Sequence, residues 1–304
     1  MERKFVDLQI NGNMGVDFSD PTLTEDMFMK AADQIFKSGT YLFLPTLVTS
    51  PKEVYLRNLA VIRSACEKHD ILANVPGVHL EGPFISDKPG AVGAHPPQFV
   101  IAPDCAFFDD IMDRSGNYVK LLTVAAEVPG VEKLIAHASS KGVAVSCGHQ
   151  LAGGADLKRA ASAGAKLLTH LGNGCPNQID RHNNMIWAGM ACDELTAMII
   201  TDGHHLPADL VKCLIRAKGA DRIIVTSDAA PIAGYPPGRY QLWENDAILE
   251  ENGRLHNPAK GCLVGSSASV ADCVKFLESL ELLSEEEICK VSCTNALKMI
   301  NCTL

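Results

Sequence analysis

The sequence contains no apolar run that approaches the ~20 residues a membrane-spanning helix needs. At the N-terminus, Met1-Glu2-Arg3-Lys4 is followed directly by a strand-like run, without the apolar segment of a signal peptide. There is also no excess of basic residues, because 27 Lys and Arg stand against 36 Asp and Glu, a net charge of −9. We therefore expect neither a membrane nor nucleic acid as partner, and any substrate phosphate would have to meet local Arg, His or backbone N–H groups.

The eleven cysteines include no CxxC pair, and their odd number argues against a disulfide framework or a structural zinc site. Cysteine within an apolar or helical stretch is usually a small buried hydrophobe. The sequence therefore indicates a reduced, cytoplasmic chain. The cysteines in such stretches are Cys66, Cys213, Cys273, Cys289 and Cys293.

Eight apolar, β-branched segments alternate with helix-like segments, and near-continuous hydrophobic strands are typical of parallel sheets buried on both faces. This alternation predicts a single α/β domain over residues 1–304, a (β/α)8 TIM barrel. The alternative is an open doubly wound sheet, but Asn11-Gly12-Asn13-Met14-Gly15 does not fit its GxGxxG turn. The predicted strands are Phe5–Ile10, Thr40–Thr46, Asn74–Leu80, Val119–Ala125, Gly142–Cys147, Lys166–His170, Thr196–Thr201 and Arg222–Ser227.

Residues typical of helix caps predict where several helices begin and end. Ser50-Pro51-Lys52-Glu53 reads as a capping box with proline at the first helical position. Glycines 142, 164 and 219 follow helix-like segments as predicted C-caps. After the eighth strand we expect a polar hairpin insertion and then two helices. These segments are Gly238–Leu263, Ser267–Leu280 and Ser284–Val291, the last opened by Ser284-x-x-Glu287.

Short polar motifs end five of the predicted strands, where an apolar run meets a carboxylate or imidazole. Such groups are costly to bury without a partner or a task. In a barrel the carboxyl ends of all strands share the face that carries the chemistry, so the motifs are expected to form one rim. They are His79-Leu-Glu81-Gly82-Pro83, Cys147-Gly148-His149, Thr169-His170, Asp202-Gly203-His204-His205 and Ser227-Asp228.

Two imidazoles and one carboxylate suit a catalytic Zn²⁺ site, so we predict Glu81, His149 and His170 as metal ligands. A lone histidine is more often a hydrogen-bonded core residue. Here, however, the polar motifs recur at about the spacing of one strand–helix unit, which favours a metal site. Asp228 is the predicted general base for a metal-bound water. Its alternative role, an N-cap, is disfavoured by Pro231 and Gly234.

Two further histidines, His95 and His205, could bind substrate or polarise a carbonyl, although His95 lies in a long loop where its role could be mere solvation.

Several segments, in the same order along nearly the whole chain, resemble the N-acetylglucosamine-6-phosphate deacetylase family of the amidohydrolase superfamily. The matching segments are Val6-Asp7-Leu8-Gln9-Ile10-Asn11-Gly12, His79-Leu-Glu-Gly-Pro-Phe84, Gly93-Ala94-His95-Pro96, Gly148-His149, Thr169-His170-Leu-Gly-Asn173, Asp202-Gly203-His204-His205, Ser227-Asp228-Ala229 and Leu263-Val264-Gly265-Ser266.

The resemblance implies a metal-dependent barrel that hydrolyses an N-acetyl amide. His95 would polarise the acetyl carbonyl and His205 would contact the sugar or its phosphate. Asn173 and Gly174 would add further substrate contacts. Gln9-x-Asn11 stands where many amidohydrolases carry His-x-His, which implies one divalent metal, Zn²⁺ before Fe²⁺ or another first-row ion.

Two departures from the family pattern concern the substrate and the assembly. The residues expected for the substrate phosphate are Arg181 and His182, within one subunit or across a dimer interface. The small β-sandwich that the family builds from both termini is expected to be absent, so a homodimer could cover the exposed barrel ends. Two alternatives stay open: a related enzyme for another N-acyl or cyclic amide substrate, and a degenerate barrel used as a binding module, which predicts no bound metal.

Overall fold

A computed structural model describes residues 3–242 and 245–303 of the chain, so Met1 and Glu2 of the N-terminal segment lie outside the described residues. Eight strands form one sheet in which every neighbouring pair is parallel and the spatial order follows the chain. The strands are β1 (Phe5–Ile10), β4 (Thr40–Val48), β5 (Val78–Glu81), β6 (Val119–Val124), β7 (Ala144–Cys147), β8 (Leu167–Leu168), β9 (Thr196–Ile199) and β10 (Ile223–Val225).

The first and last strands are joined by contacts just beyond the regular ladder. Ile10 and Ala229 form a parallel bridge, and the Asn11 N–H donates to the Ala229 carbonyl at 2.8 Å. Also between the first and last strands, the Thr226 hydroxyl donates a hydrogen bond to Asp7 Oδ1 at 2.6 Å. The predicted (β/α)8 barrel is therefore confirmed, and the open doubly wound sheet is wrong.

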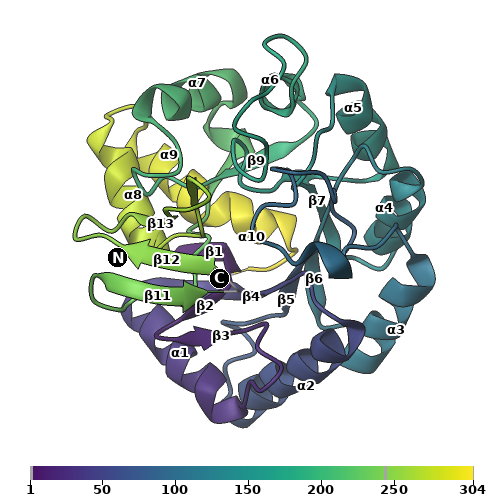
Figure 1. Cartoon of the computed structure of the whole chain (residues 1–304), viewed down its shortest axis with the longest axis vertical. Coiled ribbons are helices and arrows are strands. Elements are labelled where there is room, and N and C mark those ends of the chain that lie inside the picture. The colour runs from purple at the N-terminus through teal and green to yellow at the C-terminus, as the bar shows by residue number, and fades with distance from the viewer. Residues whose placement is uncertain (1–2, 243–244, 304) are drawn as a thin grey trace.

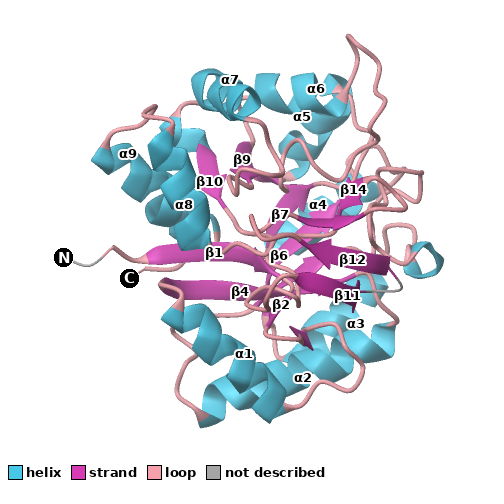
Figure 2. Ribbon diagram, turned by 60° about the vertical axis from the view of Figure 1, so that its left-hand side comes forward, coloured by secondary structure: helices cyan, strands magenta, loops and turns pink. Residues whose placement is uncertain are grey.

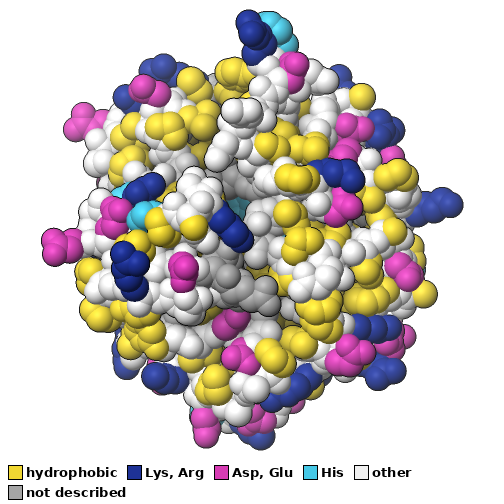
Figure 3. Space-filling model, in the orientation of Figure 1, with side chains coloured by type: hydrophobic (Ala, Val, Ile, Leu, Met, Phe, Trp, Pro, Cys, Tyr) yellow, Lys and Arg dark blue, Asp and Glu magenta, His cyan; other side chains and the backbone are white. Residues whose placement is uncertain are grey.

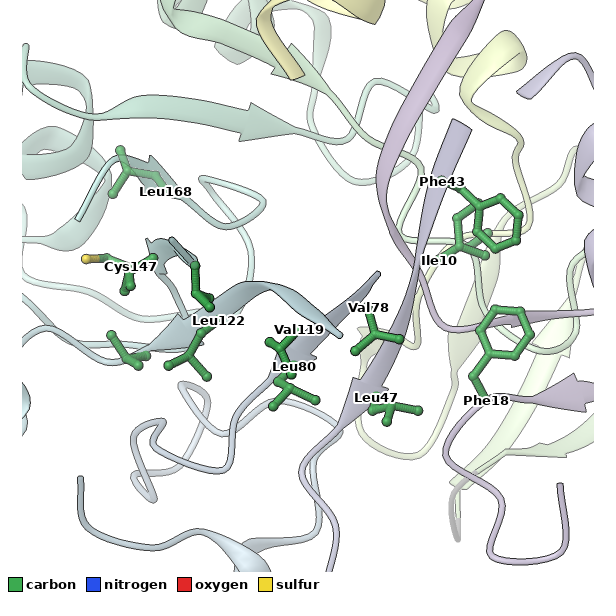
Figure 4. Packing of buried hydrophobic residues seen from close by; sticks show 14 of the residues in the cluster. Ile10, Phe18, Phe43, Leu47, Val78, Leu80, Val119, Leu122, Cys147 and Leu168 are labelled. Atoms are coloured by element: carbon green, nitrogen blue, oxygen red, sulfur yellow. The ribbon is translucent and has the colours of Figure 1, made fainter. Parts of the chain in front are cut away.

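Helices surround the strands on the outside of the ring (Figure 1). Residues alternate along each strand, so that one set of apolar side chains faces the helices and the other faces the barrel interior. Figure 4 shows part of the outer layer, where Phe18 and Phe43 lie near Ile10. The surrounding helices are α1 (Glu25–Lys37), α2 (Lys52–Lys68), α3 (Cys105–Ser115), α4 (Val131–Ser140), α5 (Gly154–Ala163), α6 (Met185–Ala191), α7 (Ala208–Lys218) and α8 (Val270–Ser279).

The C-terminal helical segment covers the amino end of the barrel. It runs through α9 (Glu285–Cys289), a π-helical turn (Lys290–Thr294) and α10 (Asn295–Met299), well beyond the predicted end at Val291. The Asn295 side-chain amide donates to the carbonyls of Ala220 and Ile223, both at 2.8 Å, and ties the segment to the start of β10. Side chains of α10 join the inner apolar cluster, so this end is filled.

The insertion after β10 contains the predicted antiparallel hairpin, which two further strands extend into a four-stranded sheet. Figure 2 shows its strands at the carboxyl end of β1 and β4. Alternate apolar residues such as Leu242, Leu249 and Leu255 pack with Ile232 into a cluster of their own, which explains why more than two strands assemble. Its strands are β11 (Gly238–Leu242), β12 (Asn245–Leu249), β13 (Leu255–Asn257) and β14 (Cys262–Leu263); residues 243–244 lie outside the described part. A short hairpin, β2 (Gly12–Asn13) with β3 (Val16–Asp17), follows β1.

Some predicted element ends are confirmed and others are wrong. Ser284 and Glu287 form the predicted capping box, and Gly164 and Gly219 terminate their helices. Ser50 does not cap α2, because its hydroxyl donates to the Val48 carbonyl at 2.9 Å.

Three further boundaries differ. Gly142 follows Lys141, which is the C-cap of α4. The helix predicted from Ser267 begins only at Val270, where Ser269 and Asp272 form a capping box. The strand predicted from Asn74 begins at Val78, because Pro76 has no N–H for a ladder.

All eleven cysteines lie in the described part and are free. Cys66, Cys273 and Cys293 are buried as predicted, whereas Cys213 and Cys289 are exposed, so the prediction of buried positions was wrong for these two. They lie on outward-facing positions of α7 and α9. Among the described helices, none has the length and apolar character that crossing a membrane requires.

Candidate active site

The polar motifs meet at the carboxyl end of the barrel. Glu81 is the last residue of β5, His149 and His170 follow β7 and β8, and Asp228 follows β10. Only 3% of Glu81, 6% of His149 and 3% of His170 is exposed, although all three side chains are polar. Such groups require partners, and here the three side chains lie within hydrogen-bond distance of one another.

Three of these residues have a left-handed backbone, with φ of 50° at His149, 28° at His170 and 51° at Asp228. Residues other than glycine rarely adopt this backbone conformation, and those that are held in it cluster at functional sites. The turn at each strand end aims the side chain into the mouth of the barrel. The observed outliers therefore point to function at this rim.

The potential ligand atoms of Glu81, His149 and His170 converge at metal-site spacing. His170 Nε2 lies 3.0 Å from Glu81 Oε1 and 3.1 Å from His149 Nε2, and His149 Nε2 lies 3.2 Å from Glu81 Oε1. Ligand atoms around a tetrahedral Zn²⁺, each ~2.05 Å from the ion, lie about 3.3 Å apart. The residues present therefore fit a single divalent cation.

A third imidazole, that of His95, stands beside this group. Its Nε2 lies 3.3 Å from His149 Nε2 and 3.5 Å from Glu81 Oε2, so Glu81, His95 and His149 also form a set of possible ligands. The hydrogen bonds distinguish the rings. The Thr49 N–H donates to His95 Nδ1, which leaves the proton of the neutral ring on Nε2, facing the site.

His149 has the opposite arrangement. Its Nδ1 lies 2.8 Å from the Ala91 carbonyl and must donate to it, so its Nε2 presents a lone pair, as a metal ligand requires. Burial lowers the pKa of His95 to about 4, which keeps that ring neutral. The hydrogen bonds thus give His149 Nε2 the lone pair that a metal ligand needs, and His95 Nε2 a proton to donate.

His79, two residues before Glu81, is not part of the group. Its Nδ1 lies 3.2 Å from Thr46 Oγ1 and its Nε2 lies 2.8 Å from Thr123 Oγ1, so both nitrogens are used inside the barrel. Burial lowers its pKa to about 4. It is a hydrogen-bonded core histidine.

Two amide side chains, Gln9 in β1 and Asn11 just after it, hold the carboxylates in place. Gln9 Nε2 donates to Glu81 Oε1 at 2.7 Å and to Asp228 Oδ1 at 3.0 Å, and Asn11 Nδ2 donates to Asp228 Oδ1 at 2.8 Å. Burial, together with the charge of Glu81, raises the pKa of Asp228. Burial also acts to raise the pKa of Glu81, but the charge of His149 and the surrounding imidazoles hold it well below its usual range.

On the loop after β9, Asp202 organises His205. Oδ2 of Asp202 lies 2.7 Å from His205 Nδ1 and accepts a hydrogen bond from the Ser266 hydroxyl at 2.8 Å. Burial acts to raise the pKa of Asp202, but the hydrogen bond and charge of His205 hold it well below its usual range. The sequence motif contained Asp202, yet its positioning of His205 became visible only in the structure.

A cavity of about 630 Å³ opens over this group and is lined by Asp228, His205, Asn173 and Gly174. Figure 3 shows the hollow near the centre of this face, with a histidine inside it and a basic side chain at its edge. A Cβ added to Gly174 would lie 3.0 Å from His170 Cε1 and 3.1 Å from His149 Nδ1, so the bare backbone packs against both rings. A second cavity, of about 360 Å³, lies between β1, α1 and α8 and contains none of the predicted site residues.

Arg181 and His182 are not brought to the cavity. Both are exposed on the loop between β8 and α6, and they are not among the residues that line the cavity. The basic side chains that do line it, Arg254 and Lys260, come from the insertion sheet. The sequence carried no local signal for them, because their placement depends on how that sheet folds over the barrel.

Comparison with known proteins places this geometry among characterised enzymes, although no family model matches the chain. The chain is 30% identical over 297 residues to the N-acetylgalactosamine-6-phosphate deacetylase of Escherichia coli O157:H7, covering 97% of this chain and 77% of that protein. It is 33% identical over 289 residues to the N-acetylglucosamine-6-phosphate deacetylase of Bos taurus, covering 90% and 68%.

Solved structures agree with these relatives. A mutant N-acetyl-D-glucosamine-6-phosphate deacetylase from Mycobacterium smegmatis, in complex with N-acetyl-D-glucosamine-6-phosphate, superposes with a TM-score of 0.88 at 25% identity, over 99% of this chain and 77% of that one. The N-acetylglucosamine-6-phosphate deacetylase from Thermotoga maritima gives 0.86 at 26% identity, over 99% and 78%.

Proposed function

Since this chain belongs to the N-acetylglucosamine-6-phosphate deacetylase family, we propose that it hydrolyses the N-acetyl amide of an amino sugar 6-phosphate, N-acetylglucosamine 6-phosphate in the first place. The products are the free amine and acetate. The observation that carries the proposal is the convergence of Glu81, His149 and His170 beside Asp228 at the base of the cavity.

Glu81, His149 and His170 would hold one divalent ion, Zn²⁺ in our proposal, with Fe²⁺ or another first-row ion as the alternatives. When bound, such an ion lowers the pKa of water toward ~7 and polarises a carbonyl oxygen. Gln9 and Asn11 donate hydrogen bonds where a second ion would need ligands, which supports a single-metal site.

Asp228 is the proposed proton carrier. Asn11 and Gln9 both donate to its Oδ1, which supports the ionised form and leaves Oδ2 to accept a proton from the attacking water. As the water oxygen bonds to the acetyl carbon, Asp228 takes the proton and then delivers it to the nitrogen when the C–N bond breaks. His95 Nε2–H donates to the carbonyl oxygen as negative charge develops there; loss of such a donor typically costs roughly 10²–10³ in rate.

The remaining predicted residues would bind the sugar. His205, Asn173 and Gly174 line the cavity and are available to its hydroxyl and phosphate groups. Arg181 lies on an outward loop, and its carbonyl accepts a hydrogen bond from the exposed Trp187 indole at 3.1 Å. This exposed surface supports a homodimer in which Arg181 and His182 would serve the neighbouring subunit.

The free cysteines support a reducing compartment, and we propose that a single barrel domain over residues 1–304 works in the cytoplasm. Two alternatives remain. A related enzyme for another N-acyl or cyclic amide substrate would require that the site does not use a phosphorylated amino sugar. A degenerate binding module would require that the site holds no metal.

The deciding experiment measures acetate release from N-acetylglucosamine 6-phosphate, and from its galacto epimer, together with the metal content of the purified protein. We expect about one equivalent of metal, and a loss of turnover of at least about a hundredfold in Asp228→Asn with metal retained. Absence of acetate release from both sugars by metal-loaded protein, or comparable turnover in Asp228→Asn, would contradict the proposal.

A further inference from the structure

The carboxylate of Asp228 is presented by a turn that begins where the regular ladder of β10 ends. The Thr226 N–H still donates to the Ile199 carbonyl at the end of β9, at 3.1 Å. The next N–H, that of Ser227, donates instead to the side chain of Asp7. Asp228 then takes its left-handed conformation, which a residue other than glycine keeps only where its surroundings hold it. The contact between Ser227 and Asp7 is therefore part of what fixes the proposed proton carrier.

The Asp7 carboxylate accepts hydrogen bonds from both sides of the junction between β10 and β1. After β10, the Ser227 N–H lies 3.2 Å from Oδ1 and 3.3 Å from Oδ2, and the Thr226 hydroxyl donates to Oδ1 at 2.6 Å. On β1, the Gln9 N–H donates to Oδ1 at 3.2 Å. Gln9 is the residue whose side-chain amide donates to Asp228 Oδ1 at 3.0 Å. One carboxylate thus fixes both the backbone that precedes Asp228 and the backbone of the amide that holds its side chain.

These three donors require a carboxylate at position 7. Asp7, Thr226 and Ser227 are each 0% exposed, so bulk water cannot replace a lost acceptor. An ionised carboxylate accepts at both oxygens, whereas an amide presents N–H groups at one of its two ends. Burial raises the pKa of Asp7 to about 6, so the group is still mostly ionised at neutral pH. Asp7 therefore has the charge state that its donors need.

Asp7 does not share the active-site cavity with Asp228. It lines the second cavity, between β1, α1 and α8, and it is not among the described residues that line the active-site cavity. Any effect of Asp7 on the reaction must therefore pass through the residues that it holds.

We propose that Asp7 is a positioning residue that keeps Asp228 aligned for proton transfer. Ser227 transmits its effect to the backbone of Asp228, and Gln9 transmits it to the carboxylate. The assignment rests on the proposed function, because it takes Asp228 to carry the proton between the water and the amide nitrogen. Misplacement of a reacting group by ~1 Å can cost about a hundredfold in rate. Loss of the anchor is thus expected to slow the chemical step and to leave the binding of the sugar in place.

The test measures kcat and KM for acetate release from N-acetylglucosamine 6-phosphate by the metal-loaded protein. Asp7→Asn is expected to lower kcat by at least about tenfold, with KM unchanged within about twofold and metal retained. Lys218→Met is the matched control for a purely structural role. The buried Lys218 ammonium donates to the carbonyls of Cys192 and Leu195, and none of the three residues lines the active-site cavity.

Lys218→Met is expected to lose stability but to keep kcat within about twofold. A fall in kcat for Asp7→Asn no larger than that for Lys218→Met, or a loss of metal from Asp7→Asn, overturns the assignment.

A second pair of variants tests the same anchor with a smaller change. Thr226→Val removes the hydroxyl that donates to the Asp7 carboxylate, and Thr226→Ser keeps it. We expect kcat to fall by about threefold in Thr226→Val and to stay unchanged in Thr226→Ser. Equal kcat values in these two variants overturn the assignment as well.

A structural comparison separates this assignment from the deacetylation itself. Crystal structures of metal-loaded Asp7→Asn and of the metal-loaded unaltered protein require no turnover. We expect that in Asp7→Asn either Asp228 leaves its left-handed conformation or its Oδ1 loses the hydrogen bond from Gln9. Such a change supports the positioning role even if the unaltered protein releases no acetate, a result that contradicts the proposed function alone. An unchanged turn in Asp7→Asn overturns the positioning role even if acetate is released.

Discussion

Asp202 and His205 form a hydrogen-bonded pair in which Oδ2 of the carboxylate lies 2.7 Å from Nδ1 of the ring. The other carboxylate oxygen accepts hydrogen bonds from the N–H groups of His204 and His205, both at 2.8 Å. The pair fixes both the orientation of the ring and the nitrogen that carries its proton, so that His205 Nε2 is the atom presented to a ligand.

Asp202→Asn is expected to impair substrate binding more than the chemical step. An amide cannot accept at both of its ends, so either the ring or the two backbone N–H groups lose their acceptor. We expect KM to rise by roughly tenfold with a smaller change in kcat. Steady-state kinetics of Asp202→Asn beside Ser266→Ala, which removes one donor to the same carboxylate, checks this. A fall in kcat at unchanged KM would place Asp202 in the chemical step instead.

His170→Ala is expected to remove metal, whereas His79→Gln is expected to remove stability. His170 Nε2 faces Glu81 and His149, but both nitrogens of His79 are hydrogen-bonded to threonines. We expect His79→Gln to lower the free energy of unfolding by about 1–3 kcal/mol while the protein keeps its metal. Elemental analysis and denaturant unfolding of both variants distinguish the two roles. Full metal content in His170→Ala would rule out its assignment as a ligand.

Removal of metal from the unaltered protein by a chelator is the companion measurement. It should abolish turnover and lower the melting temperature, because an ion bound only by the folded state stabilises that state by mass action. Addition of Zn²⁺ should restore both quantities, and turnover that persists at undetectable metal content would contradict the metal-dependent mechanism.

Gly174→Ala is expected to inactivate the enzyme by displacing the imidazoles. Gly174 has φ of +59°, and an added Cβ would lie 3.0 Å from His170 Cε1. Gly130→Ala is the matched control, because Gly130 has φ of +85° but no atom within 4 Å of its added Cβ. Both variants should lose about 1–2 kcal/mol of stability from the left-handed backbone, and only Gly174→Ala should lose metal affinity and turnover. Equal activities would show that this close approach is unimportant.

The buried carboxyl group of Asp7, which lies between β1 and β10, is expected to make stability depend on pH. Burial raises the pKa of this carboxyl to about 6, against the opposing hydrogen bonds from Ser227 and Thr226. Between its unfolded value near ~3.9 and about 6 the native state binds the proton more tightly, so the free energy of unfolding falls as pH rises through this window. The loss amounts to about 3 kcal/mol at most.

Asp7→Asn has no such proton to lose. Denaturant unfolding at pH 4.5 and pH 7 should show the variant gaining stability relative to the unaltered protein as pH rises. A difference between the two proteins that stays constant with pH would mean that Asp7 does not titrate in this range.

The eight barrel strands could be predicted from the sequence because parallel strands buried on both faces are continuous apolar runs. The rim could be predicted for the same reason, since Glu81, His149, His170 and Asp228 each stand where such a run ends. What brings the ligand atoms of Glu81, His149 and His170 within about 3 Å of one another is the closure of the ring, which the fold class already implied.

The remaining features depend on contacts that no local pattern records. The tautomers of His95 and His149 follow from Thr49 and Ala91, which are distant in sequence. Ser50 does not take the capping role expected of it, because its hydroxyl donates a hydrogen bond to the Val48 carbonyl of a strand. The insertion sheet joins short strands through tertiary packing, so its register, and with it the position of Arg254, could not be foreseen.

The helix α10 and the inner apolar side chains beneath the site give the cavity a blind end. Whatever enters at the mouth must leave by the same route, and under the proposed reaction the acetyl group is the part that lies deepest. The amino sugar then stands between acetate and the exit, so departure of the two products is ordered, with acetate last. Acetate is accordingly expected to inhibit in competition with the substrate.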